Sequence, residues 1–224
     1  MLVRGQDNNG LVPLYRFNIE TRDTTFLFSL KSSLHRQSWG AEENPILSAD
    51  GKNIFYIEKN RNTSTSKVFS YDLATGAIES IVTFDSPDIT SFSASPDGKY
   101  LSAIVLYQGQ AGRPSAIRIV SLSGGETHDL FKERWGDATK FFGLGWSPDS
   151  RYIYYIRMNA ETESNSVWRV DILEGQPQNT GISMTDIRMP NIHPNGKHLV
   201  FYGGDGWYRT TYEVRAIKIT SNPD

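Results

Sequence analysis

The segment Ser95-Pro96-Asp97-Gly98-Lys99 decides the fold, because it recurs in four related versions along the chain of 224 residues. Proline fixes φ, aspartate can bond the backbone amide that follows, and glycine supplies a positive φ, so the segment is suited to a tight turn. The third residues of successive copies stand 47, 52 and 46 residues apart. The four copies are Ser48-Ala49-Asp50-Gly51-Lys52, Ser95-Pro96-Asp97-Gly98-Lys99, Ser147-Pro148-Asp149-Ser150-Arg151 and His193-Pro194-Asn195-Gly196-Lys197.

A strand is expected directly after each turn. Apolar residues recur four and six positions after the Asp or Asn of the turn, which is the alternation of a strand with one buried face. They are Ile54 and Tyr56, Leu101 and Ala103, Ile153 and Tyr155, and Leu199 and Phe201. Before the turn lies another extended segment, at 89–94, 141–146 and 187–192, in which large residues alternate with small ones such as Ser91, Ser93, Gly143 and Gly145.

Two further strands complete each repeat. Third strands are expected at 14–19, 67–73, 116–122, 167–172 and 212–219, and weaker fourth strands at 25–30, 79–84, 127–131 and 178–184. No amphipathic helix of three turns is visible in the sequence, which excludes a fold of alternating strands and helices. Four strands in a period of about 48 residues is the pattern of a β-propeller blade.

The repeat resembles that of a known family. Ser95-Pro96-Asp97-Gly98-Lys99 followed by an apolar strand, with Val167-Trp168-Arg169-Val170-Asp171 in a later strand, is similar to the TolB-type, WD-repeat-like propeller repeat of bacterial periplasmic and sensor proteins. The resemblance covers roughly 1–219 and implies the fold and a periplasmic or otherwise extracytoplasmic location. The chain departs from the pattern at Ser150, His193 and Asn195, residues that still permit a turn.

We therefore expect an all-β fold, a β-propeller with four-stranded antiparallel blades, about four and a half of them. Residues 1–224 would form a single propeller domain or part of one, with blades near 1–32 (partial), 41–84, 88–133, 140–184 and 186–219 (partial). Because Leu2 and Val3 align with the second strand of a blade and no fourth strand follows 212–219, we expect the C-terminal part of a propeller of six to eight blades. The alternative is a short intact protein that closes by dimerisation. Open blade edges predict self-association.

Charge and composition exclude several classes of partner and chemistry. Lys and Arg number 23 against 25 Asp and Glu, a net charge of −2, so the basic excess that gathers nucleic acid is missing. Cysteine is absent, which removes disulfides, thiolate metal sites and cysteine nucleophiles. No apolar run approaches the roughly 18 residues of a membrane helix, and 1–10 lacks the apolar region of a secretory signal, so the compartment stays open.

None of the candidate catalytic and ligand-binding motifs matches its sequence pattern in full. Gly145-Trp146-Ser147-Pro148-Asp149 fails the nucleophile-elbow pattern at its last position, and Gly203-Gly204-Asp205-Gly206 lacks the Lys-Ser/Thr of a phosphate loop. His193 and His198 lie five apart across a turn, without the carboxylate pattern that would complete a metal site. We expect no catalytic residue, metal or cofactor in this chain, and a structural role in the turns for Asp50, Gly51, Asp97, Gly98, Asp149, Asn195 and Gly196.

Binding residues are expected on one face. In a propeller, the loops that join second to third strands and one blade to the next emerge on the same side, here called the loop face, opposite the four Ser-Pro-Asp-Gly-type turns of the turn face. Aromatic residues and arginine, the composition of interaction hot spots, gather in these loops. The candidates are Arg36, Trp39, Arg134, Trp135, Trp207, Tyr208 and Arg209, with Tyr107 and Arg61 in the same set of loops. The alternative is that these aromatic residues cover the core between blades.

Two functions fit this reading. One is a non-enzymatic interaction or sensor module that presents the loop face to a protein or peptide. The other is the substrate-gating propeller of a prolyl-oligopeptidase-like or tricorn-like serine peptidase whose catalytic domain lies outside this chain.

Overall fold

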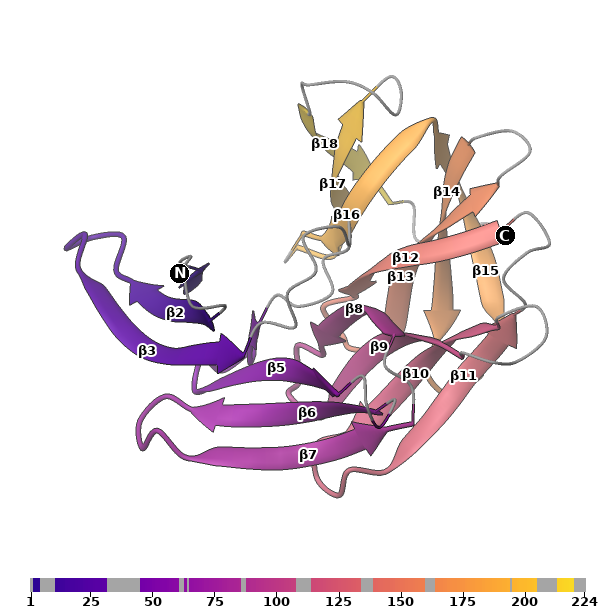
Figure 1. Cartoon of the computed structure of the whole chain (residues 1–224). Coiled ribbons are helices and arrows are strands. Elements are labelled where there is room, and N and C mark those ends of the chain that lie inside the picture. The colour runs from indigo at the N-terminus through magenta and orange to yellow at the C-terminus, as the bar shows by residue number, and fades with distance from the viewer. Residues whose placement is uncertain are drawn as a thin grey trace. The chain divides into compact units, whose positions relative to one another are not determined.

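The computed structural model describes residues 2–4, 11–31, 45–60, 63, 65–85, 88–107, 114–133, 139–159, 164–193, 195–204 and 213–219. These residues form eighteen β-strands arranged in five antiparallel sheets (Figure 1). Each strand pairs with its neighbours along the chain, so every sheet is an up-and-down meander. Within these ranges no helix has the length and apolar character that crossing a membrane requires.

Residues 1–87 form one compact unit, which contains two sheets. Its aromatic side chains hold the two sheets together: the Phe28 ring stacks on Tyr71 at 4.4 Å between centroids, and it packs against Tyr56 at 5.2 Å. The strands are β1 (Leu2–Arg4), β2 (Leu11–Phe17) and β3 (Thr24–Lys31) in the first sheet, and β4 (Ile46–Leu47), β5 (Asn53–Asn60), β6 (Thr65–Asp72) and β7 (Ile78–Phe84) in the second.

Residues 88–224 form the other unit, which contains three sheets. The first consists of β8 (Asp88–Ala94), β9 (Tyr100–Leu106), β10 (Ser115–Ser121) and β11 (Thr127–Glu133). The second consists of β12 (Thr139–Trp146), β13 (Tyr152–Asn159), β14 (Ser164–Asp171) and β15 (Pro177–Met184). The third consists of β16 (Asp186–Ile192), β17 (His198–Gly204) and β18 (Glu213–Lys218).

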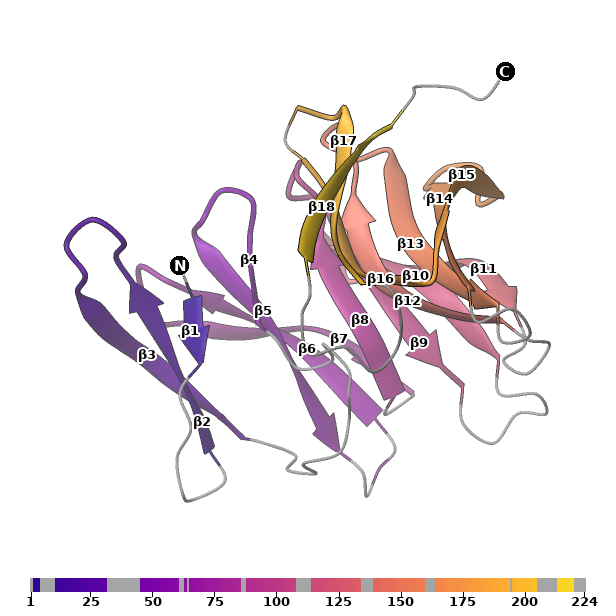
Figure 2. The ribbon, with the colours of Figure 1, turned by 90° about the horizontal axis from the view of Figure 1, so that it is seen from above.

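The first strands of these three sheets lie side by side, with β12 between β8 and β16, an arrangement that Figure 2 shows from above. Their approach is close enough to require small residues. A Cβ atom on Gly145 would lie 2.6 Å from the Pro190 carbonyl oxygen, and one on Gly143 would lie 2.6 Å from Pro190 Cδ. The Gly143 amide, at a bulge where φ is +68°, donates a hydrogen bond to Ser91 Oγ at 3.0 Å. This contact explains why large residues alternate with small ones in these strands.

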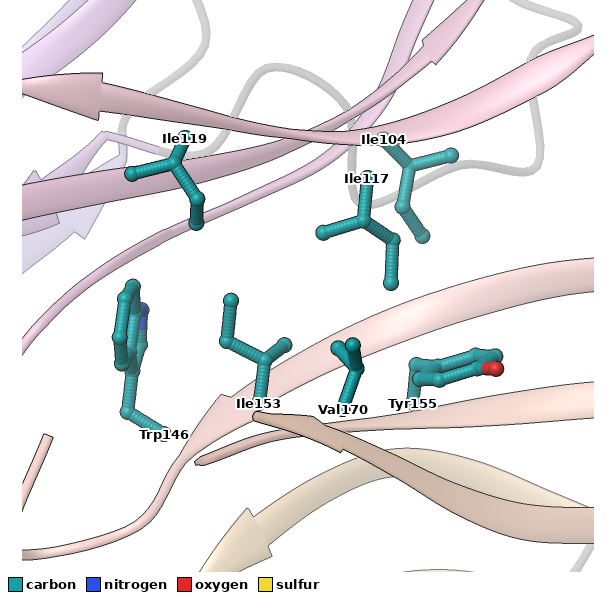
Figure 3. Close-up of a cluster of buried hydrophobic side chains, with 7 residues drawn as sticks. All are labelled: Ile104, Ile117, Ile119, Trp146, Ile153, Tyr155 and Val170. Carbon is teal, nitrogen blue, oxygen red and sulfur yellow. The ribbon is translucent and has the colours of Figure 1, made fainter. Parts of the chain in front are cut away.

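Apolar clusters fill the space between neighbouring sheets of the second unit. Figure 3 shows Ile104, Ile117 and Ile119 of the first sheet facing Ile153 and Tyr155 of the second; Trp146 and Val170 complete this cluster. A second cluster, built around Ile156, Val167, Ile187, Leu199 and Phe201, joins the second sheet to the third. The middle sheet of this unit is therefore covered on both faces, which explains the nearly continuous burial of β13.

The prediction of four-stranded blades, about four and a half in number with a partial blade at each end, is corrected to five sheets of three or four strands. The described residues form five sheets, and the two at the chain ends have three strands each. Three antiparallel strands with an apolar face are enough for a stable sheet, so a blade short of one strand is still a whole sheet. A propeller of six to eight blades was inferred from a count of about four and a half blades. The structure replaces that count with five sheets. The expected run of three, four, four, four and three strands and the all-β class agree with the structure.

Replacing Gly145 with alanine tests the close approach of β12 and β16. We expect Gly145→Ala to lower the free energy of unfolding by about 2–3 kcal/mol, because its methyl group must displace the backbone at Pro190. Gly124→Ala is the matched control: its Cβ would meet only Glu126 Cγ at 4.0 Å, and a change within about 0.5 kcal/mol is expected. Chemical denaturation of both variants measures the difference, and equal stabilities would contradict the proposed contact.

Candidate functional site

The turn face is built from one repeated hydrogen-bond arrangement. In the second copy, Ser95 Oγ donates to Asp97 Oδ1 at 2.6 Å and accepts the Tyr100 amide at 2.9 Å. Asp97 Oδ1 also accepts the Lys99 amide at 3.1 Å. The first and third copies repeat these three bonds with Ser48 and Asp50, and with Ser147 and Asp149, at 2.5–3.1 Å. The Ser and Asp side chains therefore hold each of these three turns closed.

These bonds favour the ionised carboxylate. The hydrogen bond from Ser48 holds the pKa of the Asp50 carboxyl below its usual range. Partial burial raises the pKa of Asp97, but the hydrogen bonds from Ser95 and the Lys99 amide outweigh burial and leave it lowered. These carboxylates are held by their own turns, which explains them without any catalytic role.

A second turn is joined to each of these. The backbone carbonyl of Lys99 accepts the Leu122 amide at 2.9 Å, and the equivalent bonds run from Leu73 to Lys52, from Ile172 to Arg151 and from Ile219 to Lys197. In the third sheet to carry the turn, Arg151 Nε also donates to Asp171 Oδ2 at 2.7 Å, and Asp171 is almost fully buried. In each of these four sheets the first hairpin turn is therefore tied to the residue that follows the third of the strands expected for a blade.

In the third copy of the turn, Ser150 replaces glycine, and its side chain makes a hydrogen bond that compensates for the backbone strain. Ser150 has φ of +59°, a left-handed conformation that strains any residue with a side chain. Its hydroxyl accepts the Asp97 amide at 3.0 Å, a bond between two neighbouring turns that glycine could not make. Sequence reasoning missed this bond, because the two residues are 53 positions apart.

The residues predicted to bind a partner at the loop face are Arg36, Trp39, Arg134, Trp135, Trp207, Tyr208 and Arg209, and all lie outside the described residues, as does Arg61. The strand ends that carry these loops are described. Leu106 pairs with Ser115, and Ser115 pairs with Glu133, so the ends of β9 and β11 and the start of β10 form one edge. Tyr107 and Glu133 therefore mark the loop-face edge of this sheet.

The Tyr107 side chain contacts residues of its own sheet. Its hydroxyl bonds the Asp129 carboxylate and the Arg118 guanidinium, and Lys132 Nζ lies 3.7 Å from its ring centroid. Arg118 Nε donates to Asp129 Oδ1 at 2.6 Å. Burial, with the nearby Asp129 carboxylate, raises the pKa of Tyr107 to about 12. The structure therefore shows that Tyr107 makes its contacts within the sheet. Sequence reasoning placed Tyr107 among the aromatic residues of the loops and did not predict its bonds to Asp129 and Arg118.

A second charged group lies at the same edge, between the first two sheets of the second unit. Arg157 Nη2 donates to Glu133 Oε2, and the guanidinium lies 4.6 Å from the Trp168 ring centroid. Trp168 Nε1 donates to Ser166 Oγ at 2.9 Å. The ion pair joins β11 to β13 directly before the loop that begins at Arg134. Glu133 and Arg157 lie 24 positions apart in different repeats, so the sequence contained no signal for this pairing.

The histidine pair is held within the fourth turn. His193 Nδ1 accepts the Asn195 amide at 3.2 Å, and the two imidazole centroids are 6.3 Å apart. Among the residues that the structure describes, no three His, Cys, Asp or Glu side chains gather as a metal site.

A scan against protein-family models finds none that matches the sequence, and a search of curated proteins finds no match either. Solved structures do match along nearly the whole chain. TolB from Acinetobacter baumannii aligns with a TM-score of 0.70 and 16% identity over 98% of this chain and 50% of that one. The β-propeller domain of the Trilobed protease from Pyrococcus furiosus aligns at 0.60 and 13%, over 98% of this chain and 65% of that one.

The fold is a β-propeller, similar to the folds of TolB and of the Trilobed protease domain. The expected TolB-like repeat is thereby confirmed at the level of fold. Pyrococcus horikoshii acylaminoacyl peptidase is also similar, with a TM-score of 0.64 and 12% identity over all of this chain and 38% of that one. The chain spans half the length of the A. baumannii TolB. At these identities the likeness establishes the propeller and leaves its function to be argued separately.

The strained turn residue gives a prediction. Ser150→Ala keeps the unfavourable φ and loses the bond from the Asp97 amide, so unfolding should become easier by about 1 kcal/mol. Ser150→Gly loses the same bond but removes the strain, and its stability should stay near that of the wild type. Thermal and urea unfolding of the pair measure the difference; an alanine variant as stable as the glycine variant would refute the compensation.

The Asp129 pair gives a pH-dependent prediction. Burial raises the pKa of Asp129, but the hydrogen bonds from Arg118 and Tyr107 outweigh it and leave the pKa lowered. Because the pKa of Asp129 is lower in the folded state than in the unfolded state, the ionised carboxylate stabilises the folded protein above about pH 4. This contribution is lost as the pH falls further and the carboxylate is protonated. Arg118→Met should therefore lower the free energy of unfolding by about 2 kcal/mol at neutral pH, because the partly buried Asp129 carboxylate loses its arginine and keeps only the Tyr107 hydroxyl as a side-chain donor, and by much less at pH values below about 4.

Arg215→Met is the control for this measurement. Its partner Glu213 is 73% exposed, so a change within about 0.5 kcal/mol is expected at either pH. A pH-independent loss in Arg118→Met would show that packing, and not the ion pair, accounts for the effect.

Proposed function

We propose that this propeller is a non-enzymatic interaction module that binds a protein or peptide through its loop face. The observation that carries the proposal is the division of roles between the two ends of the sheets. At the turn face, the Ser and Asp side chains of the first three turns are used in the bonds that build the turns. At the loop face, the connections between strands contain the aromatic and arginine residues on which interfaces rely.

The proposed contact residues lie in loops that begin at the ends of described strands. Arg134 and Trp135 come immediately after Glu133, the last residue of β11, and Trp207, Tyr208 and Arg209 come shortly after Gly204, the last residue of β17. Arg36 and Trp39 belong to the connection between β3 and β4. The Glu133–Arg157 ion pair and the Trp168 ring hold one of these starting points in place. Binding residues on loops that leave a rigid sheet are the usual arrangement in proteins.

The proposal is tested by panning a displayed peptide library against the purified chain and titrating the selected peptides. We expect Trp135→Ala and Trp207→Ala to weaken binding by about thirtyfold or more, the usual effect of truncating a tryptophan at the centre of an interface. Asp97→Ala should leave affinity unchanged and lower stability by about 1 kcal/mol through loss of its turn bonds. Selected peptides that bind both tryptophan variants with wild-type affinity would exclude this loop face.

The second candidate is a substrate-gating propeller of a serine peptidase, and the likeness to the acylaminoacyl peptidase of P. horikoshii favours it. In that case the nucleophile would belong to an α/β-hydrolase domain encoded in the same reading frame. Sequencing the flanking gene discriminates the two: such a domain supports gating, and its absence supports the interaction module. An extracytoplasmic location, which rests on the resemblance to periplasmic repeat proteins, belongs to the proposal as well and is tested by fractionation of the source cells.

A further inference from the structure

The fourth turn lacks the carboxylate that the other three contain. In the first two turns the Lys52 and Lys99 ammonium groups lie 3.9 and 3.7 Å from the Asp50 and Asp97 carboxylates. In the fourth turn the neutral Asn195 occupies that position. Within the described residues, Lys197 has no carboxylate at ion-pair distance. The backbone of the turn is unchanged, because the Gly196 amide donates to the His193 carbonyl at 2.8 Å and the Lys197 amide to Asn195 Oδ1 at 2.9 Å.

A hydrogen bond fixes the tautomer of His193. The Asn195 amide donates to His193 Nδ1 at 3.2 Å, so Nδ1 is an acceptor. A neutral imidazole whose Nδ1 accepts carries its proton on Nε2. His198 Nδ1 lies 3.3 Å from Asn195 Nδ2 and 3.5 Å from Asn195 Oδ1, so either tautomer of His198 can bond the Asn195 side chain. His193 therefore offers an Nε2–H donor, His198 offers one in its Nε2-protonated tautomer, and the turn itself uses neither.

These donors lie beside a second lysine. His198 is directly opposite Lys218 in the register of β17 and β18, so the two side chains share one face of the sheet. Lys218, like Lys197, is exposed and has no carboxylate at ion-pair distance among the described residues. The imidazole centroids are 6.3 Å apart, a separation that one oxyanion can bridge through two of its oxygen atoms.

We propose that the fourth turn, formed by His193, Asn195, Lys197 and His198 with Lys218 opposite, binds an oxyanion, either a carboxylate or a phosphate. The bound oxyanion lies outside the turn and supplies the negative charge that aspartate supplies in the other turns. It accepts from His193 Nε2–H and from His198 Nε2–H, and it faces the two ammonium groups. The site is on the turn face and is independent of the loop-face function.

NMR titration tests the site. The ring signals of His193 and His198 should shift saturably when sodium phosphate or sodium acetate replaces chloride at constant ionic strength and about pH 7.5, where an ordinary imidazole is neutral. His128, exposed on β11, is the internal control and should not shift. A response to both anions identifies a general oxyanion site, and a response to phosphate alone identifies a phosphate site. With a few exposed contacts, a dissociation constant on the order of millimolar is expected.

The internal repeat supplies the decisive variant. His193→Ser combined with Asn195→Asp recreates the Ser-Pro-Asp-Gly-Lys turn of the second copy, so the chain should fold normally and lose the response of His198. Lys197→Ala should weaken binding by about two- to fivefold, the range for an exposed ion pair, and Lys99→Ala in the second turn should leave it unchanged. The proposal is overturned if neither anion gives a saturable shift, if His128 shifts equally, or if the double variant responds as the wild type does.

Discussion

The serine hydroxyl of the turn is the contact on which the rest of this structure depends. Ser95 Oγ donates to the carboxylate two residues ahead and accepts the amide five residues ahead, so a single oxygen joins the end of β8 to the start of β9. The same bonds recur in the first and third copies. They fix the register of the first hairpin in each of these three sheets, and with it the residues that face the core between sheets.

The second constraint is the narrow spacing of the first strands. Gly143 and Gly145 allow β12 to approach Pro190 on β16, and Ser91 bonds the backbone at the resulting bulge. Larger residues on the next strand out, such as Ile153 and Tyr155 of β13, fill the wider space there. The change from small to large side chains across a sheet therefore follows its geometry.

Much of the fold could be predicted because its signals are local. The turn residues and the strands after them lie within ten positions of one another, and their spacing alone located the sheets. The bond from Asp97 to Ser150 and the pairing of Glu133 with Arg157 could not be predicted, since each joins residues of different repeats. Tyr107 shows the same limit: its aromatic ring suggested a binding residue, while its hydroxyl is held by Asp129 and Arg118, which the sequence alone could not place beside it.

Because every strand pairs with its neighbours along the chain, each sheet contains all of its own hydrogen-bond partners within about one repeat. A sheet such as β8 to β11 can therefore form as soon as its last strand has left the ribosome, without waiting for residues made later. The apolar faces between sheets are then covered one after another in the order of synthesis. Because each sheet contacts only its neighbours, a repeat can be gained or lost in evolution without changes to the sequences of the other repeats.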